Sequence, residues 1–301
     1  DSWFDMGASS LHAVHILLGL NTELGLDLSL ADIYAYPSVS ALLGHVQGTG
    51  RRHRNRVDFC AGSGEPQPLL VLVHPVGGAL SCYWPMIRAT REDFQVIGLC
   101  ADAGQRFDTL EDQALEYLEQ LQDSLQAARP VVLAGWSFGG VLAVEMARLL
   151  SDRGRQQLAL VTLDAGAPLD SVVQLPPSLL QQLFQDDLEH CAQIQATGQA
   201  VAEVCESATQ ERFALFCRHY AALLDYRYRA PACPTWHLQA SVEQPSSGLR
   251  PLAGQDRDAH CLTLAGDHYS ILSGAALEQI LLSLAAAVRE VSAADDRQAG
   301  T

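Results

Sequence analysis

A serine flanked by glycines, in Gly135-Trp136-Ser137-Phe138-Gly139, is the residue of this sequence best suited to covalent chemistry. A short apolar stretch typical of a buried strand precedes it and a long helical pattern follows it, which is the strand–turn–helix setting of a G-x-S-x-G motif. In that setting the hydroxyl is exposed at a helix N-terminus, where the helix dipole and free N–H groups favour negative charge. We therefore predict that Ser137 is a nucleophile; the alternative is a tight turn without chemistry.

A serine hydroxyl is a weak nucleophile unless a base takes its proton. Where this motif occurs in an α/β domain, the acid and then the histidine follow the serine along the chain. His268, in the stretch "LTLAGDHYSIL", lies in the loop after the last predicted strand, and we predict that it is the base. His237 and His260 lie at or within predicted strands and are interpreted as structural, and His74 comes before the serine.

The acid that orients the base is predicted to be Asp164, which ends the apolar stretch "LALVTLD". The C-terminal ends of parallel strands face the active site in α/β sheets. Asp267 is adjacent to the histidine, and sequence neighbours point apart. Three other aspartates lie in or near a helical insertion: Asp170, Asp186 and Asp187. We expect Asp164 to fix the tautomer of His268 and to stabilise its imidazolium form.

An oxyanion formed at the serine needs two N–H donors aimed at it. The backbone N–H of Phe138, directly after the nucleophile, is the first candidate. The second is expected in the loop "HPVGGAL", at Val76 or alternatively at Gly77, since the glycines there let the backbone approach a substrate. A flexible turn without this role is the alternative.

The elements that must position these residues alternate along the chain, which predicts a mostly parallel sheet covered by helices on both faces. A capping box, Thr109 to Asp112, begins the first of the helices. The predicted strands span 68–75, 94–101, 130–137, 158–166, 234–240 and 260–266, and the predicted helices span 109–128, 138–154 and 276–291.

Three segments interrupt or flank this α/β domain, which we place at 67–292. Residues 171–228 are helical and polar, and an insertion of this length is typical of a lid over a site. Residues 48–66 hold glycines, prolines and a run of arginines, which indicates a solvated linker. Residues 293–301 are expected to be a disordered tail.

Residues 1–47 form a separate helical unit by their pattern, with helices expected from Ser10 to Leu24, around 30–34 and from Ser38. A break is expected at Tyr36-Pro37, with Ser38 as the N-cap of the next helix. The unit holds too little apolar surface to be stable alone. The chain begins with Asp, and we expect it to be a piece of a longer polypeptide.

Composition excludes several classes of function. The net charge of −16 at pH 7 disfavours a nucleic-acid partner, because phosphates would be repelled. The eight cysteines include no C-x-x-C pair, so we expect no metal site, and without a signal peptide we expect reduced thiols and a cytoplasmic protein. No apolar run is long enough to cross a membrane.

The stretches "GWSFGG", "HPVGG", "TLDAGAP" and "GDHYSIL" together resemble the terminal thioesterase domains of nonribosomal peptide synthetases and polyketide synthases. The resemblance covers roughly residues 66–292, lid included, and implies an α/β-hydrolase fold. It also implies that Ser137, Asp164 and His268 form a catalytic triad. Asp164 follows the strand directly after the serine turn rather than a later one, which is common in this family.

The opening stretch "WFDMGASSL" resembles the "FFDLGGxSL"-like segments of acyl and peptidyl carrier domains. The resemblance implies that Ser10 bears phosphopantetheine; without it, Ser10 would be read as a helix N-cap. Such carriers are four-helix bundles, so 1–47 would be a partial carrier without its first helix. We expect this truncated unit to be poorly stable.

Together the two resemblances imply a chain-terminating thioesterase. An acyl or peptidyl thioester on Ser10 would pass to Ser137 and leave by hydrolysis or by cyclisation. Upstream synthetase or synthase modules and a phosphopantetheinyl transferase would be the partners. A stand-alone esterase or editing thioesterase remains an alternative, as does a non-catalytic docking module.

Overall fold

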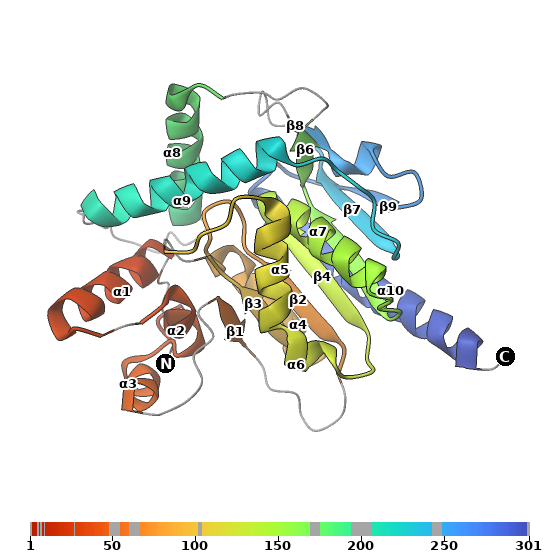
Figure 1. Ribbon diagram of the computed structural model, residues 1–301, viewed down its shortest axis with the longest axis horizontal. Helices are drawn as coiled ribbons and strands as arrows, with labels where there is room; N and C mark the ends of the chain where they lie inside the picture. The colour runs from red at the N-terminus through yellow and green to blue at the C-terminus, as the bar shows by residue number, and fades with distance from the viewer. Residues whose placement is uncertain are drawn as a thin grey trace.

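The computed structural model describes residues 2–4, 6, 8, 10–26, 28–47, 55–59, 67–101, 104–168, 175–193, 206–242 and 249–299. Its centre is a seven-stranded sheet with the order β1-β3-β2-β4-β5-β7-β9 (Figure 1). All neighbours pair in parallel except β1 with β3. The strands are β1 (Arg56–Asp58), β2 (Leu69–Val73), β3 (Gln95–Leu99), β4 (Val131–Trp136), β5 (Leu158–Leu163), β7 (Thr235–Ala240) and β9 (His260–Leu264). The predicted mostly parallel sheet is confirmed.

Helices cover both faces of this sheet, which is why every residue of its central strands β2, β4 and β5 is buried and all but a few are apolar. In β2, Leu70 and Leu72 join the core that includes α10, whereas Leu69, Val71 and Val73 join the core that includes α7. None of the helices in the described part of the chain is long and apolar enough to cross a membrane. The covering helices are α4 (Trp84–Thr90), α5 (Leu110–Gln120), α6 (Gln122–Leu125), α7 (Phe138–Asp152) and α10 (Gly274–Ala299), and short 3₁₀ turns span Ser81–Tyr83, Leu252–Gly254 and Ser270–Leu272.

Two helices, α8 (Pro177–Gln193) and α9 (Glu206–Asp225), fall within the predicted lid. They lie over the end of the sheet at which β4 and β5 terminate (Figure 1). Residues 169–174 and 194–205 of the predicted lid lie outside the described residues. Beneath the helices, an antiparallel ribbon that the sequence did not predict joins β6 (Gly166–Pro168) to β8 (Leu249–Pro251).

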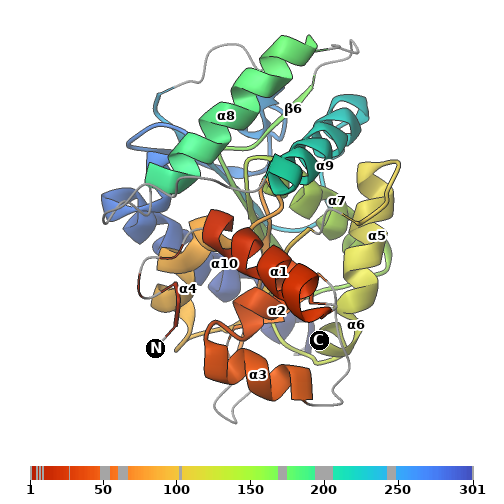
Figure 2. The ribbon, with the colours of Figure 1, turned by 90° about the vertical axis from the view of Figure 1, so that its left-hand side faces the viewer.

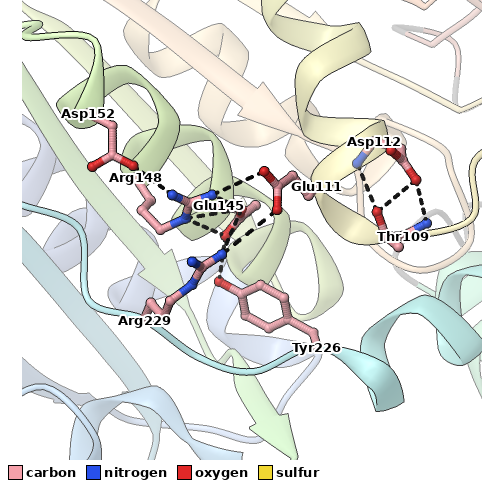
Figure 3. Close-up of polar contacts among 8 residues, drawn as sticks. All are labelled: Thr109, Glu111, Asp112, Glu145, Arg148, Asp152, Tyr226 and Arg229. Atoms are coloured by element: carbon pink, nitrogen blue, oxygen red, sulfur yellow. Dashed lines mark hydrogen bonds and ion pairs between the residues drawn. The ribbon is translucent and has the colours of Figure 1, made fainter.

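The C-terminal end of α9 is tied to α7 by a buried carboxylate, Glu145 (Figure 3). The Tyr226 hydroxyl donates to Glu145 Oε2 over 3.0 Å, and Arg148 forms a bidentate pair with the same carboxylate. Arg229 lies 3.7 Å from it. The segment that leaves the lid is therefore fixed to the helix that begins directly after Ser137. The same figure shows the predicted capping box of Thr109 at the start of α5, which is confirmed.

Residues 1–47 contain three helices, α1 (Ser10–Leu24), α2 (Leu30–Ala35) and α3 (Val39–Gln47), as predicted. The break falls at Tyr36-Pro37, and the Ala41 N–H donates to the Ser38 hydroxyl over 3.2 Å, which confirms Ser38 as the cap. A capping box that links Ser29 and Asp32 begins α2.

Phe4 and helices α1 and α2 pack on the α/β domain, so residues 1–47 do not stand apart from it. The Phe4 ring lies 5.1 Å from that of Tyr34 and 5.3 Å from that of Trp84 on α4, and Phe59 contacts Trp84 from the other side. Helix α2 contacts β1, and α1 lies beside α9 (Figure 2). The apolar surface that the segment lacks by itself is supplied by the domain on which it docks.

Two boundary predictions need correction. The segment 48–66 is not linker throughout, because Arg56–Asp58 forms β1 and extends the sheet. Arg56 is buried against Asp123, Asp58 and Ser124, so one arginine of the predicted solvated run serves the core. The predicted tail 293–301 is helical as far as Ala299, as part of α10. Residues 48–54, 60–66 and 300–301 lie outside the described residues.

Buried histidines make the stability of the fold depend on pH. Burial lowers the pKa of both His74 and His237 from 6.5 to about 4, so both rings are neutral in the folded chain. The unfolded chain binds these protons first as the pH falls, so the free energy of unfolding decreases from about pH 6.5 towards pH 4. Each ring contributes about 2 kcal/mol of that decrease between pH 7 and pH 5.

Urea unfolding of three proteins at both pH values checks this expectation. His237→Asn keeps a donor or acceptor near Thr162 Oγ1. Between pH 7 and pH 5 its free energy of unfolding should fall by about 2 kcal/mol less than that of the wild type. His260→Gln, at the protein surface, should match the wild type. If the free energy of unfolding of His237→Asn depends on pH as that of the wild type does, His237 is not one of the groups that make stability fall with pH.

The aromatic contact at Trp84 predicts how residues 1–47 are held. Trp84→Ala should lower amide protection in α1, α2 and α3 by about tenfold or more, since a large buried contact is lost, while β4 and β5 stay protected. Hydrogen exchange measures this, with exposed Leu282→Ala as the matched control. Three helices already unprotected in the wild type would contradict docking and agree with the sequence-based expectation of a poorly stable unit.

Candidate active site

Ser137 lies at the turn between β4 and α7 in a strained backbone conformation. Its φ and ψ angles are 56° and −125°, and Ser137 and Asp164 are the two non-glycine residues with positive φ among the described residues. The Ser137 N–H donates to the Leu163 carbonyl over 2.9 Å, which ties the turn to the end of β5. Strain of this kind persists only where the surrounding structure imposes it, and it gathers at functional sites.

The glycines of the motif are required by close approach. A Cβ atom at Gly135 would collide with the backbone of Gly139, and one at Gly139 would collide with the backbone at Val73 and His74. The helix after the serine can therefore begin against the end of β2 only because both positions lack side chains.

Asp164 and His268 meet beside this turn. His268 Nδ1 lies 2.6 Å from Asp164 Oδ2, so Nδ1 carries the proton and Nε2 is left as the basic nitrogen. The second carboxylate oxygen accepts the Gln239 side-chain amide and the Ala240 N–H, the latter over 2.9 Å. Three donors therefore hold the Asp164 carboxylate. Gln239 was missed from the sequence, although its place at the end of β7, next to β5, could have indicated it.

Trp136 and Tyr83 also position the site and were missed. The Trp136 indole N–H donates to the His268 carbonyl over 2.9 Å, and its ring lies 4.7 Å from the imidazole. The Tyr83 hydroxyl accepts the Trp136 N–H and donates to the Val73 carbonyl, both over 2.7 Å. These contacts join residues far apart in the chain, so no local pattern announces them.

Three residues that the sequence analysis did not favour as base or acid have other hydrogen-bond partners in the structure. The Asp267 carboxylate accepts the N–H groups of Tyr269 and Ser270 and caps the turn after the histidine. His237 bonds Thr162 within the sheet, and His260 lies near Glu290 at the surface.

A cavity of about 190 Å³ brings the candidate residues together. Ser137, Asp164 and His268 line it, as do both expected oxyanion residues, Val76 and Phe138. The lid contributes Leu183 and Asp187 from α8 and Phe216 and Tyr220 from α9, and the β8 side contributes Leu249 and Pro251. The insertion therefore forms one wall of the cavity.

Ser10, the expected attachment site, is the first residue of α1. The free N–H groups at the start of a 15-residue helix suit a serine that carries a phosphodiester, so its placement fits phosphopantetheine. No group of three or more metal-ligating side chains occurs among the described residues. None of the five described cysteines forms a disulfide: Cys82, Cys100, Cys217, Cys233 and Cys261.

Comparison with curated proteins gives matches that cover part of this chain and part of each relative. The dimodular nonribosomal peptide synthase of Bacillus subtilis (strain 168) is 32% identical over 169 residues, which cover 55% of this chain and 7% of that protein. Thioesterase AMT4 of Alternaria alternata is 31% identical over 136 residues, 42% of this chain and 50% of that protein. The chain thus spans less than a tenth of the first of these relatives.

Solved structures share the fold. The four-domain nonribosomal peptide synthetase holo-AB3403 aligns with a TM-score of 0.59 and 23% identity, over 99% of this chain and 24% of that one. The thioesterase domain SrfTE, described in connection with cyclisation of the lipopeptide surfactin, aligns with a TM-score of 0.57 and 18% identity, over 79% and 98%. The predicted α/β-hydrolase fold, preceded by a small helical segment, is confirmed.

Two family models match the chain in succession. The model for the phosphopantetheine attachment site matches residues 1–46, and the model for the thioesterase domain matches residues 68–287. The second match covers most of the chain and contains the cavity described above. This chain therefore belongs to the thioesterase family, acts as a hydrolase on thioesters, and carries a phosphopantetheine attachment segment ahead of its thioesterase domain.

Proposed function

We propose that this chain ends the assembly of a nonribosomal peptide or polyketide by releasing the finished acyl chain. The observation that carries the proposal is the attachment segment packed directly on a thioesterase domain that holds Ser137, Asp164 and His268 around one cavity. Upstream modules of a longer synthetase or synthase would deliver the chain. The five described cysteines form no disulfide, which is consistent with a cytoplasmic location.

Acylation uses the serine turn and the Asp164–His268 pair. Ser137 Oγ attacks the thioester carbonyl while His268 Nε2 takes its proton, and Asp164 stabilises the imidazolium that forms. The N–H groups of Val76 and Phe138 stabilise the negative oxygen. His268 then returns the proton to the departing sulfur, and the acyl chain remains as an ester on Ser137.

Release reverses these roles. His268 takes a proton from water, or from a nucleophile within the acyl chain, which attacks the ester carbonyl. As the acyl–Oγ bond of Ser137 breaks, His268 returns that proton to Ser137 Oγ, and an acid or a macrocycle leaves. Lid residues such as Leu183 and Phe216 face the cavity that holds the ester, so the lid decides how much water reaches it.

Ser10 is the proposed point of attachment of the prosthetic arm, added by a phosphopantetheinyl transferase. When bound, phosphopantetheine supplies the thiol that carries the acyl chain as a thioester. Helix α1, which begins at Ser10, lies beside lid helix α9, so the proposed attachment point belongs to an element in contact with the lid (Figure 2).

Ser137→Ala tests the nucleophile. The full chain is loaded with a butyryl-phosphopantetheine arm by a phosphopantetheinyl transferase, and release is followed by intact mass. Release should fall about 10³-fold or more, because the nucleophile is lost. Ser292→Ala is the matched control, because it removes a hydroxyl that donates to the Val288 carbonyl within α10. Release from Ser137→Ala at the wild-type rate would overturn the proposal.

Ser10→Ala separates the proposed function from that of a stand-alone esterase. The variant should accept no prosthetic arm, while its hydrolysis of free butyryl-N-acetylcysteamine stays within about twofold of wild type, because the cavity is untouched. Ser9→Ala is the matched control and should load normally. Loading of Ser10→Ala would contradict the assigned attachment point.

A further inference from the structure

The loop that carries Val76 is held from behind by two buried histidines. His74 Nδ1 lies 2.7 Å from the Pro75 carbonyl oxygen, and His219 Nδ1, from lid helix α9, lies 2.6 Å from the Val76 carbonyl oxygen. Both rings are fully buried. A carbonyl oxygen only accepts hydrogen bonds, so each Nδ1 carries the proton.

The remaining contacts of the two rings agree with this tautomer. His219 Nε2 accepts the Gln113 side-chain amide over 3.1 Å, and His74 Nε2 lies 2.7 Å from the Tyr117 hydroxyl. Burial lowers the pKa of His74 to about 4 and that of His219 well below 6.5. Both rings are therefore neutral near pH 7, with Nδ1 as donor and Nε2 as acceptor.

These two bonds fix the two peptide groups that matter for an oxyanion. The Pro75 carbonyl and the Val76 N–H belong to one planar peptide, and the Val76 carbonyl and the Gly77 N–H belong to the next. In a trans peptide the N–H points away from the carbonyl. A histidine that grips the carbonyl from behind therefore sets the direction of the N–H in front, and it polarises that N–H as well.

Side chains of the lid lie in close contact with the two glycines of this loop. A Cβ atom at Gly77 would lie 2.9 Å from a carboxylate oxygen of Asp187 on α8, and one at Gly78 would lie 3.0 Å from Leu215 on α9. The sequence interpretation assigned these glycines to the approach of substrate. In the structure the atoms nearest to the missing side chains include those of both lid helices.

His219 also contacts the other proposed donor residue. Its ring centroid lies 4.6 Å from that of Phe138, and the Phe107 ring stacks on it at 5.3 Å. One lid residue thus bonds the Val76 carbonyl and packs on the side chain of Phe138.

We propose that His219 is a positioning residue of the oxyanion hole, which makes the hole complete only while lid helix α9 is docked on the loop. The inference rests on the proposed role of Ser137 and on the donors of this loop: His219 sets the Gly77 N–H, the alternative donor, directly, and it acts on the Val76 N–H only through the Val76 backbone that links the two peptides. The acyl chain bound before reaction does not need an aligned donor as much as the tetrahedral intermediate does. Loss of alignment therefore lowers kcat and leaves KM nearly unchanged.

Two variants of similar size place an amide nitrogen differently at this position. In His219→Asn the side-chain amide nitrogen takes the position of Nδ1 and can still donate to the Val76 carbonyl. In His219→Gln the amide nitrogen takes the position of Nε2 and cannot reach that carbonyl. We expect His219→Asn to keep kcat for butyryl-N-acetylcysteamine within about threefold of wild type. For His219→Gln we expect a loss of about 10- to 100-fold in kcat, with KM within about twofold.

The rate of Ser137 labelling by an alkyl fluorophosphonate gives a second measurement, because its phosphoryl oxygen must occupy the same donors. It should follow kcat across the two variants. Ser292→Ala is the matched control: it removes a hydroxyl that donates to the Val288 carbonyl within α10 and does not line the cavity, and it should keep wild-type kcat. Ser137→Ala tests the proposed function separately, since it should neither label nor turn over.

Equal kcat in the folded Asn and Gln variants would overturn the inference even where Ser137→Ala is inert. If His219→Gln does not fold, ¹⁵N spectra of histidine-labelled wild-type protein decide between the tautomers. A signal for His219 with the proton on Nδ1 supports the inference, and one with the proton on Nε2 overturns it.

Discussion

Parallel pairing of β2, β4 and β5 is the constraint on which the rest of the structure depends. Val73 at the end of β2 pairs with Gly135, and Trp136 at the end of β4 pairs with Leu163. The residues that follow these three strands therefore leave the sheet at one edge. Shifting one strand along the sheet would separate the loop at Val76, the serine turn and Asp164 by several ångströms, and no side-chain change would restore the site.

Hydrogen bonds between the ends of β2, β4 and β5 restrict the backbone at this edge of the sheet. Tyr83 bridges the ends of β2 and β4, and the Ser137 N–H bonds the end of β5. Positive φ at both Ser137 and Asp164 persists because these neighbours fix the backbone. The serine turn and Asp164 are thus preorganised by the sheet itself, whereas the loop that carries Val76 is also held by the lid.

Local patterns were sufficient for the parts of this chain that depend on local physics. Continuous apolar runs located the parallel strands, and the capping residues Ser38 and Thr109 located helix starts. The antiparallel edge strand β1 was missed, because three residues in a segment rich in arginine carry no strand periodicity. Its pairing with β3 and the burial of Arg56 are tertiary effects that override composition.

The residues of the candidate site also fall into two groups: those that local sequence patterns indicate and those that only tertiary contacts reveal. Ser137, Asp164 and His268 follow strands or a motif, so the sequence indicates them and the structure gathers them around one cavity. Gln239, Trp136 and His219 act through contacts between residues distant in the chain; only Gln239 has a sequence signal, its position at the end of a predicted strand, whereas the types and spacings of Trp136 and His219 carry none. His219 in particular sits in a helical insertion whose register against the core no periodicity specifies.

Helix α9 links features that are distant in sequence. At one end its extension is fixed to α7 through Tyr226 and Glu145, within its length His219 bonds the Val76 carbonyl, and along its side it contacts α1, which begins at Ser10. Packed helices move as units because their interiors are close-packed. A displacement of α9 against α1 would therefore also move His219 relative to the loop that carries Val76, so the attachment segment and this loop are mechanically joined through α9.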